Sequence, residues 1–269
     1  MNPQDPNLAK VELIAHVLGA LREDLVFVGG CAVGLLMSDP AAASARVTYD
    51  VDLVVEVATL QDYHRMEKKF AAKGFARDMV ADAPICRWRY REIEVDLMPT
   101  APGILGFSNR WYPLAMTTAE NRALPSGLTI RLIAAPLFVA TKFEAFADRG
   151  AEDLLGSHDL EDIINVIDGR PELSDEIARV DGELRSHLAG KCAALLAMPN
   201  FMSYPAGLVC PRTPPCRSRV AEAARDSRIA CRSSPSPADS GRDSRSQVHT
   251  SCRTTRRWRG RSCGARDLP

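Results

Sequence analysis

Two short segments near the amino terminus constrain the fold of this chain more than any other feature. The first, Val26 to Gly30, is a β-favouring run that stops at two glycines, and a helix-like stretch from Cys31 to Met37 follows it. Glycines at such a turn let the backbone approach a ligand closely, and a helix that begins there favours anions. The sequence therefore predicts a strand, a tight turn and a short helix that together form an anion site.

The second segment, Arg46 to Leu53, alternates strictly between polar and apolar residues. In a β-strand this alternation separates the side chains onto the two faces of the sheet. Adjacent carboxylates on one face repel each other unless they are solvated, hydrogen-bonded or bridged by a cation, and a divalent ion is the simplest bridge. We expect a polar face with Arg46, Thr48, Asp50 and Asp52, and a core face with Val47, Tyr49, Val51 and Leu53.

A third acidic position lies in a later apolar run. Ile85 to Tyr90 and Glu92 to Met98 read as a pair of strands, and the second strand places Asp96 on the face opposite Ile93, Val95 and Leu97. A charge in such a setting is costly unless it is paired. Each feature also has a plainer interpretation: an ordinary turn for Gly29-Gly30, a solvated strand face for Asp50 and Asp52, and an edge-strand surface position for Asp96.

The rest of the ordered part reads as a mixed sheet followed by helices, an α+β arrangement. The expected elements are a helix from Asn7 to Leu21 capped by Asn7, a strand from Leu25 to Val28, a helix from Leu60 to Lys73 closed by Gly74, a strand from Phe75 to Val80, a loop from Pro99 to Trp111, a turn from Leu124 to Leu128, a helix from Pro136 to Arg149, a helix capped by Ser157 and stopped at Gly169, and helix from Leu173 to Met198.

Composition divides the chain into unlike parts. Residues 1–205 contain 20 Lys and Arg against 29 Asp and Glu, whereas residues 206–269 contain 14 Arg, no Lys and 5 acids. We expect a core at 1–134, a helical part of the same catalytic unit at 135–205, and a disordered low-complexity tail at 206–269. The tail lacks Phe, Tyr and Asn. A frameshift in a GC-rich gene is one hypothesis for it, and a basic arm that binds nucleic acid is the alternative.

Several classes of protein are disfavoured by the sequence. Three of the eight cysteines, Cys31, Cys86 and Cys192, are scattered through the expected fold without zinc spacing, and the others lie in the tail. We expect a reducing cytoplasm, because the amino terminus has no signal-peptide pattern and no apolar run reaches the roughly 20 residues of a membrane span. A Gly-x-x-x-x-Gly-Lys phosphate loop is also missing, and no hydrolase motif is recognisable.

The order of glycine turn, short helix, Asp-x-Asp strand and later single-Asp strand resembles the DNA polymerase beta-like nucleotidyltransferase superfamily. With Arg46-x-Thr48-x-Asp50-x-Asp52, Lys142 and Asp159-Leu160-Glu161-Asp162, the chain looks most like the AbiEii/MenT-type toxin branch. The resemblance spans roughly Val26 to Arg170. It implies a polymerase-beta-like core and transfer of an NMP from an NTP to an acceptor.

The resemblance also implies roles for individual residues. Asp50, Asp52 and Asp96 would bind two Mg²⁺ ions, and Asp96 would accept the proton of the acceptor hydroxyl. Phosphate contacts would come from the amides of Gly29 and Gly30, from Thr48, from Arg46 as electrostatic support, and from Lys142. Asp159 would be a fourth functional carboxylate, although helix capping explains Asp159 and Asp162 about as well.

The acceptor and the partners follow from the same resemblance. A toxin-type enzyme would act on RNA, most simply tRNA, and would have an antitoxin partner and no membrane contact. A stripe of Arg87, Arg89 and Arg91 would suit RNA, or it would be a solvated edge. The competing functions are a small-molecule nucleotidyltransferase of the aminoglycoside type, a non-catalytic nucleotide-binding module, and a glycosyltransferase that holds a metal-nucleotide with Asp-x-Asp.

Overall fold

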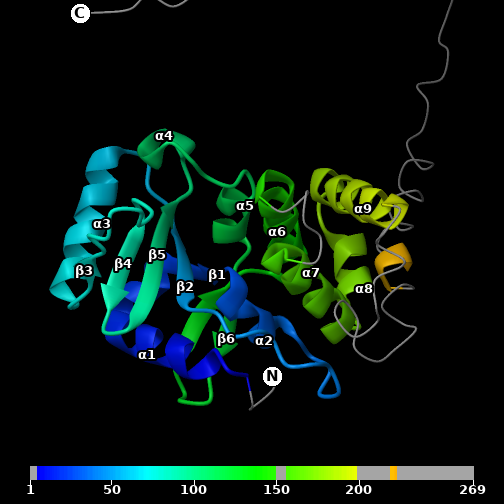
Figure 1. The fold of residues 1–269 in the computed structure, drawn as a ribbon, viewed down its shortest axis with the longest axis horizontal. Helices are drawn as coiled ribbons and strands as arrows, with labels where there is room; N and C mark the ends of the chain where they lie inside the picture. Colours follow the sequence, from blue (N-terminus) through cyan, green and yellow to red (C-terminus); the bar gives the residue numbers. More distant parts are fainter. Residues whose placement is uncertain (1–4, 150–155, 199–218, 223–269) are drawn as a thin grey trace, which may run out of the picture. The chain divides into compact units, whose positions relative to one another are not determined.

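A seven-stranded mixed sheet is the central element of the chain (Figure 1). The computed structural model describes residues 5–149, 156–198 and 219–222. The strands lie in the order β3-β4-β5-β2-β1-β7-β6. Their bounds are β1 Leu25–Val28, β2 Asp50–Val55, β3 Ala76–Arg77, β4 Arg87–Tyr90, β5 Ile93–Pro99, β6 Glu120–Ala123 and β7 Thr129–Leu132.

The pairing of β1, β2 and β5 brings the end of β1 next to the first residues of β2. Strand β1 pairs antiparallel with β2, so that Val28 at its end is the register partner of Asp52. Strand β2 pairs in parallel with β5, and Asp52 is the register partner of Asp96. All four residues of β1 are buried, as expected for a short apolar strand in the middle of a sheet. The glycine turn after Val28 therefore lies next to the first acidic residues of β2.

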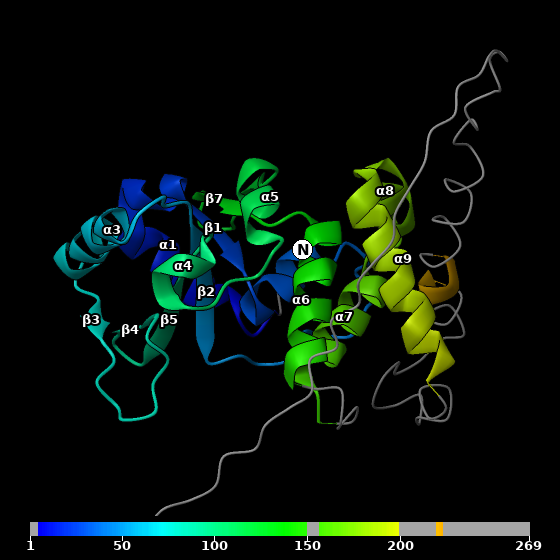
Figure 2. The ribbon, with the colours of Figure 1, turned by 90° about the horizontal axis from the view of Figure 1, so that it is seen from above.

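Helices lie on both sides of this sheet, and α6 to α9 form a group beside its β1 side, away from α3 (Figures 1 and 2). The helical segments are α1 Leu8–Leu18, η1 Gly19–Asp24, η2 Gly30–Ala32, α2 Val33–Leu36, α3 Leu60–Ala72, α4 Pro102–Leu105, α5 Tyr112–Thr117, α6 Ala135–Arg149, α7 His158–Gly169, α8 Leu173–Arg179 and α9 Gly182–Ala197. One continuous apolar core joins the sheet to α6 and α7, since Phe138, Phe143 and Ile163 belong to it.

The predicted α+β class is confirmed, and so are many of the elements. Helix α3 ends just before Gly74, whose φ is +89°, and Ser157 caps α7 by accepting a hydrogen bond from the Leu160 amide. The strands β4 and β5 pair as expected, and the Leu124 to Leu128 turn joins β6 to β7. Helix α6 carries Pro136 in its first turn.

Other expectations were wrong in detail. The alternation from Arg46 does not form one strand, because β2 begins only at Asp50. Val47 and Tyr49 are 57 % and 80 % exposed, whereas Val51 and Leu53 are fully buried as expected. The strand predicted from Phe75 is only two residues long, Leu173 to Met198 is split into α8 and α9, and the Pro99 to Trp111 loop contains the short helix α4.

Asn7 was assigned the wrong role. In the described part of the chain its side chain makes no capping hydrogen bond to α1. It contacts the segment before β2 instead. The expected tail, 206–269, lies outside the described residues except for a helical turn at 219–222, where Val220 is buried. Among the described residues, no helix is long and apolar enough to cross a bilayer.

Candidate active site

Three carboxylates from two adjacent strands converge at one edge of the sheet. Asp50 and Asp52 are two residues apart on β2, so they share a face, and Asp96 on β5 is the register partner of Asp52. One oxygen of each can be chosen so that all lie within 4.8 Å of one another. The side chain of Asp50 is 34 % exposed and that of Asp96 only 10 %. The group is therefore open to a ligand on one side and enclosed on the other.

The glycine turn touches this acidic group directly. Gly29 has a φ of +68°, which favours glycine, and a Cβ atom there would lie 1.7 Å from Oδ2 of Asp52. A Cβ atom on Gly30 would lie 2.6 Å from Thr48 Cγ2 and 2.8 Å from Arg46 Nη2. The two glycines thus allow close contact with two different groups. Gly30 is itself buried whereas Gly29 is partly exposed, which leaves Gly29 nearer to an incoming ligand.

Arg87 on β4 neutralises part of the acidic group. Its guanidinium donates from Nε and Nη2 to the two oxygens of Asp96, both at 2.8 Å, and from Nη1 to Glu94 at 2.6 Å. Nη2 also lies 3.6 Å from Asp50 Oδ2. The hydrogen bonds to Asp96 raise the pKa of Arg87 further above its usual value. A bidentate guanidinium–carboxylate pair fixes the plane of the Asp96 carboxylate.

Asp52 is the residue whose charge is least well compensated. Burial, followed by the neighbouring charges of Asp50 and Asp96, raises the pKa of Asp52 to about 8. Lys142 and Arg87 oppose this shift without cancelling it. Cys31, in the same turn as the glycines, is a buried free thiol whose pKa is raised by burial and by the charge of Asp52. A cation bound among the carboxylates would remove the repulsion that raises the pKa of Asp52.

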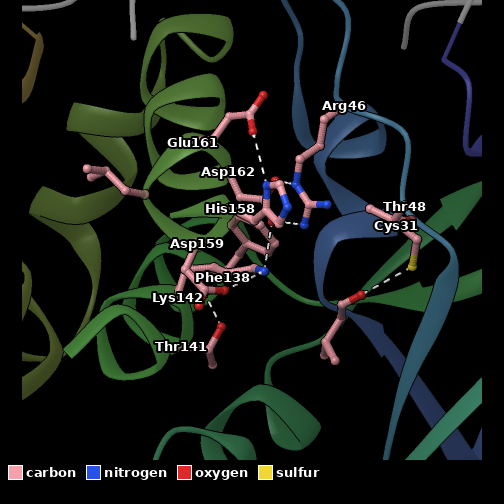
Figure 3. Close-up of polar contacts among 12 residues, drawn as sticks. Cys31, Arg46, Thr48, Phe138, Thr141, Lys142, His158, Asp159, Glu161 and Asp162 are labelled. Atoms are coloured by element: carbon pink, nitrogen blue, oxygen red, sulfur yellow. Dashed lines mark hydrogen bonds and ion pairs between the residues drawn. The ribbon is translucent and has the colours of Figure 1, made fainter. Parts of the chain in front are cut away.

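A second, cationic group surrounds Asp162 (Figure 3). It meets the glycine turn at Gly30, where an added Cβ atom would lie 2.8 Å from Arg46 Nη2 and 3.3 Å from Asp162 Oδ2. Arg46 Nε and Nη2 donate to the two oxygens of Asp162 on α7, at 2.9 and 3.1 Å. Lys142 Nζ on α6 lies 2.8 Å from Asp162 Oδ2 and 3.1 Å from Asp159 Oδ1, and Arg149 donates to Asp159 at 2.9 Å. These five residues contain three cations and two carboxylates, so one positive charge is in excess.

Burial differs strongly within this cationic group. The side chain of Asp162 has no exposed surface, that of Lys142 is 11 % exposed, and that of Arg149 is 71 % exposed. Burial lowers the pKa of Lys142, but Asp162 and Asp159 outweigh it and the net pKa is raised. Burial likewise raises the pKa of Asp159, but Lys142 and Arg149 outweigh it and the net pKa is lowered. Both groups therefore stay charged at neutral pH.

Four residues at this site were missed or misjudged from the sequence. Asp162 was passed over in favour of Asp159, although it is the more buried and joins Arg46 to Lys142. Arg149 and Asn7 were not chosen. The i, i+7 spacing of Lys142 and Arg149 on one helix face was the available signal for Arg149. For Arg87, the expected pairing of the two strands was the available signal, and the observed register sets Arg87 opposite Asp96.

The arginine stripe is not a free basic surface. Arg87 is paired with Asp96, and Arg89 donates to Asp78 at 2.8 Å and to Glu94 at 2.7 Å. Arg91 lies in the β4–β5 turn with a φ of +54° and faces the ring of Tyr90. Acidic residues on the neighbouring strands thus neutralise the first two arginines.

Comparison with known proteins gives limited help. No family model matches the sequence, and no curated protein matches it. One similar solved structure is an antigenic nucleotidyltransferase-like protein from Paracoccidioides brasiliensis, with 23 % identity, a TM-score of 0.46, and coverage of 75 % of this chain and 93 % of that one. Another is the antibiotic-resistance factor ANT(2'')-Ia, with 16 % identity, a TM-score of 0.41, and coverage of 71 % and 96 %. Since both TM-scores are below 0.5, a functional assignment has to rest on the geometry of the site.

Proposed function

We propose that this chain is a Mg²⁺-dependent nucleotidyltransferase that moves an NMP from an NTP to an acceptor hydroxyl. The observation that carries the proposal is the convergence of Asp50, Asp52 and Asp96, with ligand oxygens within 4.8 Å, beside the Gly29 turn. Sequence order alone does not bring these residues together; the pairing of β1, β2 and β5 does so.

The donor set fits a hard divalent cation. The trio offers carboxylate oxygens, the ligand type that Mg²⁺ prefers. Burial and, after it, the charges of Asp50 and Asp96 raise the pKa of Asp52, and a bound cation would offset the effect of these charges. Asp50, Asp52 and Asp96 would hold the metal. We propose two ions, as in other enzymes that use paired metals for such a displacement. Bound Mg²⁺ would supply charge neutralisation at the attacking and leaving oxygens.

The protein groups account for the rest of the reaction. The acceptor hydroxyl would give its proton to a carboxylate of the trio, and we assign this role to Asp96. The acceptor oxygen would then bond to the α-phosphorus while the bond from that phosphorus to its bridging oxygen breaks and pyrophosphate leaves. Arg87 holds both oxygens of Asp96, so it fixes the direction from which Asp96 meets the acceptor. Positioning of this kind provides much of the rate in phosphoryl-type transfer.

The cationic group would hold the triphosphate. Arg46 and Lys142 are fixed by Asp162, and the excess positive charge of the group favours an anion beside the glycine turn. Arg149 is the most exposed of the three cations, so it is the one able to turn toward the phosphates. The Gly29 amide would add a hydrogen bond. The Thr48 hydroxyl is buried and lies 3.3 Å from both Asn7 Oδ1 and the Asp50 carbonyl, so Thr48 would support the segment that carries Arg46. Asp159 would act by holding Lys142 and Arg149 in place.

We consider two classes of acceptor, RNA and a small molecule. The toxin-type resemblance favours RNA, most simply tRNA, and an antitoxin partner. The pairing of Arg87 and Arg89 with acidic residues removes the basic stripe that RNA would need, which favours a small-molecule acceptor such as an aminoglycoside.

A labelling experiment separates these possibilities. The full chain is incubated with each of the four α-labelled NTPs and Mg²⁺, first with total RNA and then with a panel of aminoglycosides. Labelled RNA supports the toxin-type acceptor, and labelled drug alone rejects it in favour of the small-molecule acceptor. Asp52→Asn is the control for enzyme-dependent label. If wild-type protein and an Asp50→Ala/Asp52→Ala variant bind Mg-NTP equally and neither transfers label, the chain is a non-catalytic binding module and the proposed activity is wrong.

A further inference from the structure

We infer that Asn7 is a positioning residue for the phosphate-binding edge of the site, an inference that rests on the proposed function. Asn7 precedes α1 and is far in sequence from the residues it contacts. Its side chain has no exposed surface. Its Nδ2 donates to the carbonyl of Arg46 at 2.8 Å, and its Oδ1 accepts from the amide of Thr48 at 2.9 Å.

These two hydrogen bonds replace a neighbouring strand. The β1–β2 register begins at the pair Val28 and Asp52, and the β2–β5 register begins at Asp50 and Glu94. Residues 46–48 therefore lie before the start of both ladders. The primary amide of Asn7 offers one donor and one acceptor side by side, as a strand neighbour would. It thus holds the backbone of residues 46–48 where the sheet does not.

The chemistry of the partners fixes the orientation of the amide. The Arg46 carbonyl can only accept a hydrogen bond and the Thr48 amide can only donate one, so only one orientation of the Asn7 side chain satisfies both. The hydroxyl of Thr48 adds a second contact to Asn7 Oδ1 at 3.3 Å. An aspartate at this position would set an oxygen against the Arg46 carbonyl and lose that hydrogen bond.

Asn7 is itself rigidly held. Its own amide donates to Asp5 Oδ1 at 3.0 Å, and its carbonyl accepts from Lys10 and Val11 in the first turn of α1. Helix α1 is anchored in the core by Val11, Ile14 and Leu18, each fully buried. The start of α1 therefore acts as a fixed support for the segment that carries Arg46 and Thr48.

Loss of the Asn7 hydrogen bonds is expected to affect nucleotide binding more than acceptor binding. Arg46 and Thr48 flank Gly30 on the phosphate side of the site, and the segment leads directly into Asp50. Loss of the Asn7 amide would release this backbone and displace both side chains. Small displacements of positioning groups weaken binding and slow transfer.

The test compares nucleotide affinity with stability in the full chain. The variants are Asn7→Ala, Asn7→Ser, and Thr59→Ala as a control. Thr59 caps α3, away from the site, by accepting a hydrogen bond from the Asp62 amide, and its hydroxyl also donates to the Asp62 carboxylate. Calorimetry with each of four α,β-methylene NTP analogues in Mg²⁺ gives Kd, and thermal unfolding gives Tm. We expect both Asn7 variants to weaken binding of the preferred analogue by about 10-fold or more, while Thr59→Ala lowers Tm without changing Kd.

Two results would overturn this inference, and they are distinguishable. If wild type binds an analogue, Asp52→Asn does not, and both Asn7 variants bind like wild type, Asn7 has no positioning role although the proposed function stands. If wild type binds none of the analogues, the proposed function is wrong and the role of Asn7 is lost with it. If Asn7→Ala does not fold, Asn7→Ser decides the outcome, since its uncharged side chain is too short to bridge the Arg46 carbonyl and the Thr48 amide.

Discussion

Asp52 of β2 and Asp96 of β5 are register partners in a parallel strand pair, so two carboxylates stand opposite each other on one face of the sheet. Like charges in this arrangement are destabilising. In the structure Arg87 neutralises Asp96, whereas the pKa of Asp52 remains raised. The protein therefore maintains an electrostatically unfavourable pair at one defined place, and substitutions there are expected to separate stability from activity.

Asp52→Asn should abolish transfer while leaving the metal-free protein at least as stable as wild type, because a neutral amide replaces a carboxyl that burial and the neighbouring charges force to take up a proton. Removing a group that orients a metal ligand lowers metal affinity or activity by about 10- to 100-fold, so loss of the ligand itself should lower activity by more than about 100-fold. Mg²⁺ at 100 times its Kd should stabilise wild type by about 2.7 kcal/mol and the variant by much less. Thermal unfolding with Mg²⁺ and with EDTA checks this; equal stabilisation of both proteins by Mg²⁺ would rule out the metal site.

The pH dependence of metal-free stability should follow from Asp52. Its folded pKa of about 8 lies above the usual value of 3.8, so the folded state binds a proton more tightly than the unfolded state does. Stability should therefore be greatest below the unfolded pKa and fall as pH rises toward 8. The measurement is Tm in EDTA across this range for wild type and Asp52→Asn. A wild-type curve that runs parallel to that of the variant would contradict the assignment.

Asp162→Asn should destabilise the fold more than Asp159→Asn. Asp162 is fully buried, and its replacement removes the bidentate partner of Arg46 and one of the two carboxylates that pair with Lys142. Breaking a buried ion pair from one side costs about 3 to 5 kcal/mol. Asp159 pairs partly with the exposed Arg149, so its loss should cost less. Urea unfolding of both variants gives the comparison, and equal losses would show that the burial of Asp162 is unimportant.

Gly29→Ala should lower the free energy of unfolding more than Gly127→Ala does, although both glycines have a positive φ, +68° and +83°. Alanine at Gly127 would meet no atom within 4 Å, so it should show only backbone strain, of order 1 to 3 kcal/mol. Alanine at Gly29 would add a collision with Asp52. We expect Gly29→Ala alone to lose Mg²⁺-dependent stabilisation. Unchanged Mg²⁺ stabilisation in Gly29→Ala would mean that the turn and Asp52 are not in contact.

Local patterns were sufficient to predict much of this fold. Glycine at the end of α3, serine before α7 and alternation through Ile93, Val95 and Leu97 each depend on residues close in sequence. The same reasoning predicted that Asp50 and Asp52 share a face. Joining them to Asp96 depended on the family resemblance, because the parallel pairing of β2 with β5 connects residues more than 40 positions apart.

The errors have a common physical cause. Alternation before β2 was interpreted as a strand, yet among the described residues no strand pairs with residues 46–48, and the side chain of Asn7 takes that place. Asn7 precedes an apolar helix and so looked like a cap. The choice of Asp159 over Asp162 was arbitrary from spacing alone, since only the docking of α7 against Arg46 decides which acid is the more deeply buried. The contacts of Asn7 with residues 46–48 and of Asp162 with Arg46 leave no local periodicity in the sequence.

The pairing of Asp162 with both Arg46 and Lys142 also bears on how such a protein can evolve. The sheet edge and the helices α6 and α7 each contribute a charge that the other part must balance. Recombination that exchanged the helices for those of a distant homologue would leave a buried charge unpaired unless the matching residues were inherited together. The two parts are therefore expected to be replaced as a linked pair, and chimaeras joined between them should fold only when this ionic match is preserved.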